Sequence, residues 1–145
     1  MFAEAVRLIL ELEGGYASDP ADPGGETKFG ISKRSYPTLD IKGLTRSEAE
    51  DLYWRDYWLA AGCPSLAWPL ALVHFDAAVN HGVGRARRFL WATQDWSDYL
   101  DRRDAFYVAL TERRPPTRKF LRGWRRRLRR VRRVCERASL VTLPP

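Results

Sequence analysis

Apolar side chains recur every three or four positions along most of the chain, which is the period of an amphipathic helix. Residues 2–13 show this pattern, and Gly14-Gly15 predicts the end of that helix. Further helices are predicted over residues 45–61, 69–81, 84–94, 97–114 and 117–138. A short strand or turn is predicted over 27–31, and a helical turn with a loop over 32–43. We therefore expect a mainly α fold with at most a short β-hairpin, forming a single domain over residues 1–145.

Local signals fix the ends of several predicted helices. Thr45 followed by Glu48 forms a capping box, and Ser97 or Asp98 is expected to cap a later helix. Pro115-Pro116 should stop that later helix.

The predicted helix over 69–81 begins near Pro69, ends at Gly82 and is apolar nearly all round. It should therefore be the central buried helix. His74 is expected to be a hydrogen-bonded core residue, and Asp76 should pair with an arginine or a backbone group because an unpaired buried charge is costly.

Positive charge is concentrated near the end of the chain. The net charge is +7, but residues 118–137 hold eleven basic side chains and one acid, Glu136, so this segment carries +10 and the remainder −3. Such asymmetry indicates a polyanionic partner. The same segment has an apolar line that should pack the helix onto the body, namely Phe120, Trp124, Leu128, Val131 and Cys135. A merely solvated basic face is the plainer alternative.

Other features restrict the class of protein. Cys63 and Cys135 lack metal-ligand spacing, and the sequence leaves open whether they pair or stay free. With two scattered histidines, no zinc site is expected. No signal peptide or membrane-spanning run is visible, so we expect synthesis in the cytoplasm.

Glu13 is the acid that stands out. It follows Val6, Ile9 and Leu10 on one helical face, whereas Glu11 falls on the charged face and is expected to be solvated. A carboxyl group on such a stripe is desolvated, which favours its protonated form and suits a general acid. The loop that follows offers possible second carboxylates: Asp19, Asp22 and Glu26. The alternative is that Glu13 is a helix-end acid that reaches a nearby arginine and that the loop is an acidic turn.

The string LELEGGYASDPADPGGETKFGIS closely resembles the opening of the glycoside hydrolase family 108 muramidases. It contains E-G-G-Y at 13–16, D-P-x-D-P-G-G at 19–25 and T-x-x-G at 27–30. Residues 44–58, 74–90 and 120–131 also look like family segments, so the resemblance covers nearly the whole chain.

The resemblance implies a lysozyme-like fold and hydrolysis of the β-1,4 bond between N-acetylmuramic acid and N-acetylglucosamine in peptidoglycan, without a cofactor. It gives Glu13 the role of catalytic acid. A similar spacing in phage lysozymes implies that Asp22 is the second carboxylate and that Thr27 positions water, although Asp19 and Glu26 compete with Asp22.

Substrate contacts are expected around the same loop. Tyr16 and Phe29 could stack on sugars, although a core role suits each as well. Gly24 and Gly25 would let the backbone approach a bulky sugar, and Gly30 is also expected to contact the substrate. Asp19 and Glu26 are the acidic residues of this loop that are also expected to contact the substrate. Asn80 could contact an N-acetyl group, as could His81 less strongly, and the alternative is that both residues cap the end of their helix.

Partners and location are expected from the charge pattern, the missing signal peptide and the resemblance together. We expect glycan strands as substrate, an anionic cell wall or outer membrane bound through the arginine-rich helix, a monomer, and no preference for nucleic acid. A phage endolysin released through a holin, or a prophage remnant, fits this picture.

The rivals are a lytic transglycosylase that uses the same glutamate, a polyanion-binding module without catalysis, and a muramidase that has lost activity. The last arises because the stretch over residues 92–98 is shorter than in the family, which should reduce one wall of the cleft.

Overall fold

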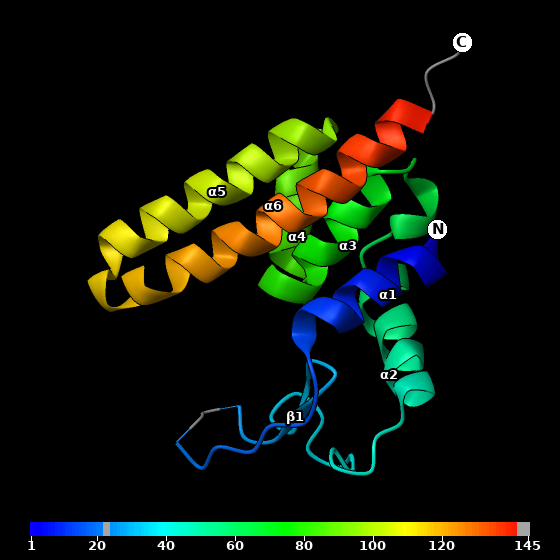
Figure 1. Cartoon of the computed structure of the whole chain (residues 1–145), viewed down its shortest axis with the longest axis vertical. Coiled ribbons are helices and arrows are strands. Elements are labelled where there is room, and N and C mark those ends of the chain that lie inside the picture. The colour runs from blue at the N-terminus through cyan, green and yellow to red at the C-terminus, as the bar shows by residue number, and fades with distance from the viewer. Residues whose placement is uncertain (22–23, 142–145) are drawn as a thin grey trace.

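The computed structural model describes residues 1–21 and 24–141, and these residues are mainly helical (Figure 1). The elements in chain order are α1 (Phe2–Glu13), β1 (Thr27–Lys28), β2 (Ile31–Ser32), α2 (Arg46–Tyr53), the π-helical segment η1 (Trp54–Leu59), the 3₁₀ turn η2 (Cys63–Ser65), α3 (Leu70–His81), α4 (Val83–Ala92), α5 (Trp96–Arg113), the 3₁₀ turn η3 (Pro115–Thr117) and α6 (Arg118–Val141). The prediction of a mainly α fold with a short β-hairpin is confirmed.

Helix α3 lies at the centre of the molecule, as its apolar composition predicted. Residues 71–78 are all buried, and α3 contacts α1, α4, α5 and α6. Phe75 meets Phe2 and Trp58 edge to face. His74 is hydrogen-bonded at both ring nitrogens, to the Tyr99 hydroxyl at 2.9 Å and to the carbonyl oxygen of Ala61 at 3.0 Å, which confirms its predicted core role.

Several helix ends differ from the predictions. The capping box of Thr45 and Glu48 is present, but the α-helix changes to a π-helix after Tyr53. The prediction that Ser97 or Asp98 caps α5 was wrong, because Asp95 takes that role and its carboxylate accepts a hydrogen bond from the Asp98 backbone N–H at 2.7 Å. The expected helical turn in residues 32–43 is a single one, in which the Tyr36 backbone N–H donates to the Ser32 carbonyl oxygen at 3.0 Å, and loop follows it.

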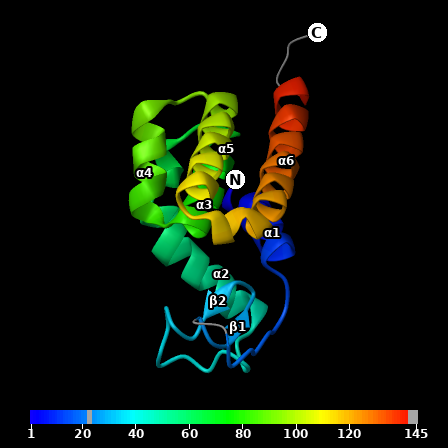
Figure 2. The same cartoon turned by 90° about the vertical axis from the view of Figure 1, so that its left-hand side faces the viewer.

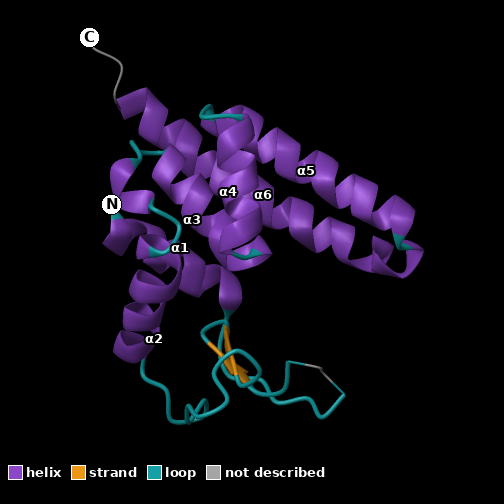
Figure 3. Cartoon of the chain, turned by 180° about the vertical axis from the view of Figure 1, so that it is seen from behind, coloured by secondary structure: helices purple, strands orange, loops and turns teal. Residues whose placement is uncertain are grey.

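The segment between α1 and α2 gathers at one end of the helical body and holds both strands (Figures 1 and 3). In the hairpin, Thr27 pairs with Ser32 and Lys28 with Ile31. Ala17 also bridges Thr27 through two backbone hydrogen bonds of 2.9 Å, so the loop after α1 is tied to the hairpin.

Helix α6 runs beside α5 and is near α1 in the side view (Figure 2). It buries Leu128, Val131 and Cys135 and half-buries Trp124, so the predicted packing of this helix on the body is confirmed. Phe120 is exposed instead, because it lies close to the turn that joins α5 to α6. None of the described helices combines the length and the apolar composition that crossing a bilayer requires.

Candidate active site

Glu13 is the last residue of α1 and lies where the helical body meets the β-hairpin. Its side chain is 24% exposed, so it is partly shielded from water yet still accessible. Gly14 follows with φ of +77°, a conformation that glycine adopts without strain, and this turns the chain away from the helix directly after the carboxylate.

Gly30 packs directly against Glu13. Its φ is +77°, and a Cβ atom there would lie 2.7 Å from the Cγ of Glu13 and would also collide with the Tyr53 hydroxyl. Only glycine fits this position, and the T-x-x-G spacing therefore has a steric basis. The Tyr53 hydroxyl donates a hydrogen bond of 2.6 Å to the carbonyl oxygen of Phe29, which itself has a positive φ of 52°. Burial, together with the Glu13 carboxylate, raises the pKa of Tyr53, so this hydroxyl stays protonated.

Arg127 of α6 holds the Glu13 carboxylate. Its Nη1 donates to Oε1 of Glu13 at 2.7 Å, and its Nε donates to Oδ1 of Asp76 at 2.9 Å. The Arg127 side chain is 12% exposed, and its two carboxylate neighbours overcome burial and raise its pKa, so it is a permanent cation. This contact is the one expected if Glu13 is a helix-end acid, and it holds the carboxylate in one orientation. Oε2 of Glu13 has no hydrogen-bond partner among the residues described.

Asp76 lies at the centre of a buried charge network. Its carboxylate accepts hydrogen bonds from Arg127 and from Nη1 of Arg103 at 2.7 Å, and the side chains of Asp76 and Arg103 are completely buried. Burial alone would raise the pKa of Asp76, but the two guanidinium groups outweigh it and hold that pKa below its usual range. The prediction that Asp76 pairs with an arginine is confirmed.

The network continues from Arg103 to the end of α3. Arg103 Nε donates to Nε2 of His81 at 3.1 Å, and its Nη2 lies 3.5 Å from Oδ1 of Asn80. The Tyr107 hydroxyl also donates to Oδ1 of Asn80. Burial and the charge of Arg103 lower the pKa of His81 to about 3, so this histidine is neutral. Asn80 and His81 thus use their side chains inside the protein.

The acidic loop provides a second group of polar contacts. The Tyr16 hydroxyl donates to Oε2 of Glu26 at 2.8 Å, and Asp19 accepts a local hydrogen bond from the Ala21 backbone N–H at 2.9 Å. Thr27 lies in β1, and its hydroxyl is unbonded within the described part of the chain. Asp22, the predicted second carboxylate, lies outside the described residues.

The structure therefore brings Glu13, Gly30 and the Phe29 carbonyl together, and it pairs Tyr16 with Glu26. Asp19 contacts its own turn, and Asn80 connects to Glu13 through Arg103, Asp76 and Arg127. Sequence analysis did not identify Arg127, Arg103 or Tyr53 as site residues. The sequence does contain an indication that Arg127 points toward the body. It lies three residues after Trp124 and four before Val131, on the edge of the apolar face of its helix.

Two further expectations can be compared with the structure. Cys63 and Cys135 are both free and buried, so the alternative of two buried thiols is the one observed. Helices α4 and α5 are joined by residues 93–95, which shows how short this connection is. Within residues 1–21 and 24–141, no cluster of histidine, cysteine and acidic side chains has the composition to hold a metal ion.

Comparison with known proteins identifies a family and a similar solved structure. Residues 6–82 match the family model described as glycosyl hydrolase 108, a range that includes Glu13, the acidic loop and Asn80. The solved structure described as "Structure of Brucella abortus SagA" is similar over 92% of this chain and 92% of that chain, with 26% identity and a TM-score of 0.76. Curated protein sequences gave no match. The structural likeness covers 92% of the chain, whereas the family match ends at residue 82, just after α3.

Proposed function

The chain belongs to the glycosyl hydrolase 108 family, and on that premise we propose that it is a muramidase acting on the β-1,4 bond between N-acetylmuramic acid and N-acetylglucosamine. The family and the structural likeness to SagA support a peptidoglycan hydrolase. The observation that carries the finer proposal is the Glu13 carboxyl group, which is half-buried at the end of α1 and held through one oxygen by Arg127.

Glu13 acts as the general acid in this proposal. Arg127 fixes Oε1, so Oε2 is the oxygen that faces a bound glycan and gives its proton to the leaving oxygen. Gly30 lets the hairpin backbone pack directly against the Glu13 side chain, because a Cβ atom there would collide with it.

The second carboxylate is assigned from the resemblance. Asp22 is proposed as the base or charge-stabilising group, and the Thr27 hydroxyl as the group that orients water. Tyr16, Asp19, Glu26 and Phe29 are proposed to contact the glycan from the loop. A role as a phage or prophage endolysin, acting on the wall after release from the cytoplasm, fits this substrate.

The test is the clearing of a purified peptidoglycan suspension, with mass spectrometry of the products. Wild-type protein should clear the suspension and release muropeptides with reducing ends. Replacing Glu13 with glutamine removes the proton donor and should lower the rate by about 100-fold to 10,000-fold. Glu11→Gln is the matched control, since Glu11 lies on the same helix in an exposed ion pair with Arg130 and should keep near wild-type activity.

Other outcomes would change the reaction or the residues assigned to this protein. Products with 1,6-anhydro ends would show a lytic transglycosylase instead of a hydrolase. Equal activity in Glu13→Gln and Glu11→Gln would remove Glu13 from the mechanism. No clearing by the wild type would contradict the muramidase proposal.

A further inference from the structure

The outer face of α6 carries a line of arginines that the proposed active site does not use. Six of them recur at intervals of four, four, three, four and four residues, which places them within an arc of about 100° on one side of the helix. We define these six as the arginine stripe: Arg118, Arg122, Arg126, Arg129, Arg133 and Arg137. The stripe is about 28 Å long, because each residue of an α-helix advances by about 1.5 Å.

All six stripe residues are exposed, and none forms an ion pair within residues 1–21 and 24–141. The other arginines of α6 differ, since each contacts an acid on another helix: Arg125 pairs with Asp104, Arg127 with Glu13 and Asp76, Arg130 with Glu11, and Arg132 with Asp101. The helix thus separates arginines that hold the fold from arginines that are available to a partner.

Other residues on this face complete its character. Lys119 lies at one edge, and Glu136 is the sole acid in the sequence of α6. Leu140 continues the line at its far end and is 69% exposed. The stripe therefore combines a row of positive charge with one terminal apolar side chain.

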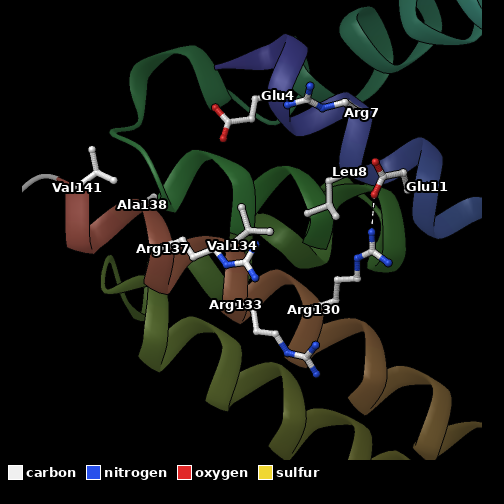
Figure 4. Close-up of a pocket in the computed structure, with 10 residues that line it drawn as sticks. All are labelled: Glu4, Arg7, Leu8, Glu11, Arg130, Arg133, Val134, Arg137, Ala138 and Val141. Carbon is white, nitrogen blue, oxygen red and sulfur yellow. Dashed lines mark hydrogen bonds and ion pairs between the residues drawn. The ribbon is translucent and has the colours of Figure 1, made fainter.

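A groove between α1 and α6 adjoins the far end of the stripe (Figure 4). Arg133 and Arg137 line it from α6 and Arg7 from α1, while Leu8 and Val134 provide apolar surface. Glu4 and Glu11 also line the groove, but Arg130 neutralises Glu11. The groove does not include Glu13, so it is separate from the proposed active site.

We propose that the arginine stripe binds the surface of an anionic phospholipid membrane. Guanidinium groups bind phosphate through paired hydrogen bonds, and a straight row of them suits a plane of headgroups. The apolar face of α6 is packed against the body, so binding is electrostatic at the headgroups, with Leu140 adding contact at one end. The proposal does not depend on the muramidase activity.

The chemistry of the stripe favours a membrane over single-stranded nucleic acid. Binding to single strands uses aromatic side chains on which bases stack, and no aromatic residue lies within the arc of the stripe. Trp124 points elsewhere and stacks on Tyr107 inside the protein. Arg127, which contacts Glu13, lies about 130° around the helix from the centre of the stripe, so membrane binding would leave the active site uncovered.

The test is sedimentation with vesicles made of equal parts phosphatidylglycerol and phosphatidylcholine, beside vesicles of phosphatidylcholine alone. Wild-type protein should bind the anionic vesicles and be released by salt. The stripe variant Arg122→Gln/Arg126→Gln/Arg129→Gln should bind about 100-fold more weakly, given the contribution of each basic residue near an anionic surface. Glu13→Gln should bind like the wild type, which separates this result from catalysis.

The matched control removes the same charge from elsewhere. Arg34, Arg88 and Arg113 are exposed and form no ion pair in the described part of the chain, so Arg34→Gln/Arg88→Gln/Arg113→Gln lowers the net charge by the same amount. It should keep most of the binding. Circular dichroism checks that both variants fold, and salt release of the wild type gives a readout that needs no variant.

Three results would overturn the proposal. One is that the wild-type protein does not bind anionic vesicles at low salt. Another is an equal loss of binding in the stripe and control variants, which would mean that net charge alone matters. The third is displacement from vesicles by DNA or teichoic acid at low competitor concentration, which would assign the stripe to a polymer.

Discussion

Arg126 and Arg127 are neighbours in the sequence, yet α6 directs them into opposite environments. Arg127 is 12% exposed and contacts two carboxylates, one of them fully buried, whereas Arg126 is exposed and unpaired among the described residues. The same contrast holds along the helix between its inner and outer arginines. The role of an arginine in α6 therefore cannot be inferred from its residue type or from the number of charges around it. It depends on whether the side chain contacts an acid of another helix.

The largest effect should come from removing Asp76, the buried acid that contacts both Arg103 of α5 and Arg127 of α6. Asp76→Ala would leave Arg103 and Arg127 without a buried partner and should lower the free energy of unfolding by about 3–5 kcal/mol. Urea denaturation would measure this. The control Asp104→Ala breaks the exposed pair with Arg125 and should cost less than about 1 kcal/mol. Similar costs for the two variants would contradict a difference in stability between the buried and the exposed ion pairs.

The next effect concerns catalysis. Arg127→Gln would lose the ion pair that orients Glu13, and we expect kcat on peptidoglycan to fall by about 100-fold with KM little changed. Arg126→Gln should keep the wild-type kcat, and Arg127→Lys should recover part of the loss because it keeps the charge. If the apparent kcat of Arg127→Gln falls only in proportion to the fraction of folded protein, Arg127 is structural and does not position Glu13.

A smaller effect should appear as a pH dependence of stability. The pKa of His81 is lowered to about 3 by burial and by Arg103, and that of His74 is also lowered by burial, whereas an unfolded chain has histidines with pKa values near 6.5. The unfolded state thus binds more protons below pH 6.5, and the free energy of unfolding should fall as the pH drops from 7 to 5.

Urea denaturation across this range, which lies above the titration of ordinary carboxylates, would measure that slope. His81→Gln should reduce the slope, while Arg126→Gln should leave it unchanged. A slope that is the same in His81→Gln and the wild type would show that His81 does not contribute.

Much of the fold could be predicted because helical periodicity and caps are local signals. The buried position of α3 and the pairing of Asp76 followed from composition alone, since a buried acid needs a cation. The identity of that cation did not follow, because Arg103 and Arg127 lie 27 and 51 residues away and one of them sits among many similar arginines. The cap of α5 was misplaced because Asp95, Ser97 and Asp98 are all residues that cap helices.

The candidate site was predicted in a similarly uneven way. The position of Glu13 could be read from the apolar stripe of α1 and from the motif that follows it. The contacts of Tyr16, Glu26 and Asp19 could not, because the acidic loop has no period from which directions can be inferred. The steric reason for Gly30 needed the structure, since it depends on Tyr53, which lies 23 residues further along the chain.

The two buried cysteines allow local unfolding of the protein to be followed by thiol labelling. Burial raises the pKa of both thiols to about 12, so neither forms a reactive thiolate in the closed state at neutral pH. Cys135 lies on the packed face of α6 and Cys63 in η2, beside α3. Labelling of Cys135 ahead of Cys63 by a thiol reagent would reveal that α6 detaches before the centre of the molecule unfolds, without any engineered cysteine.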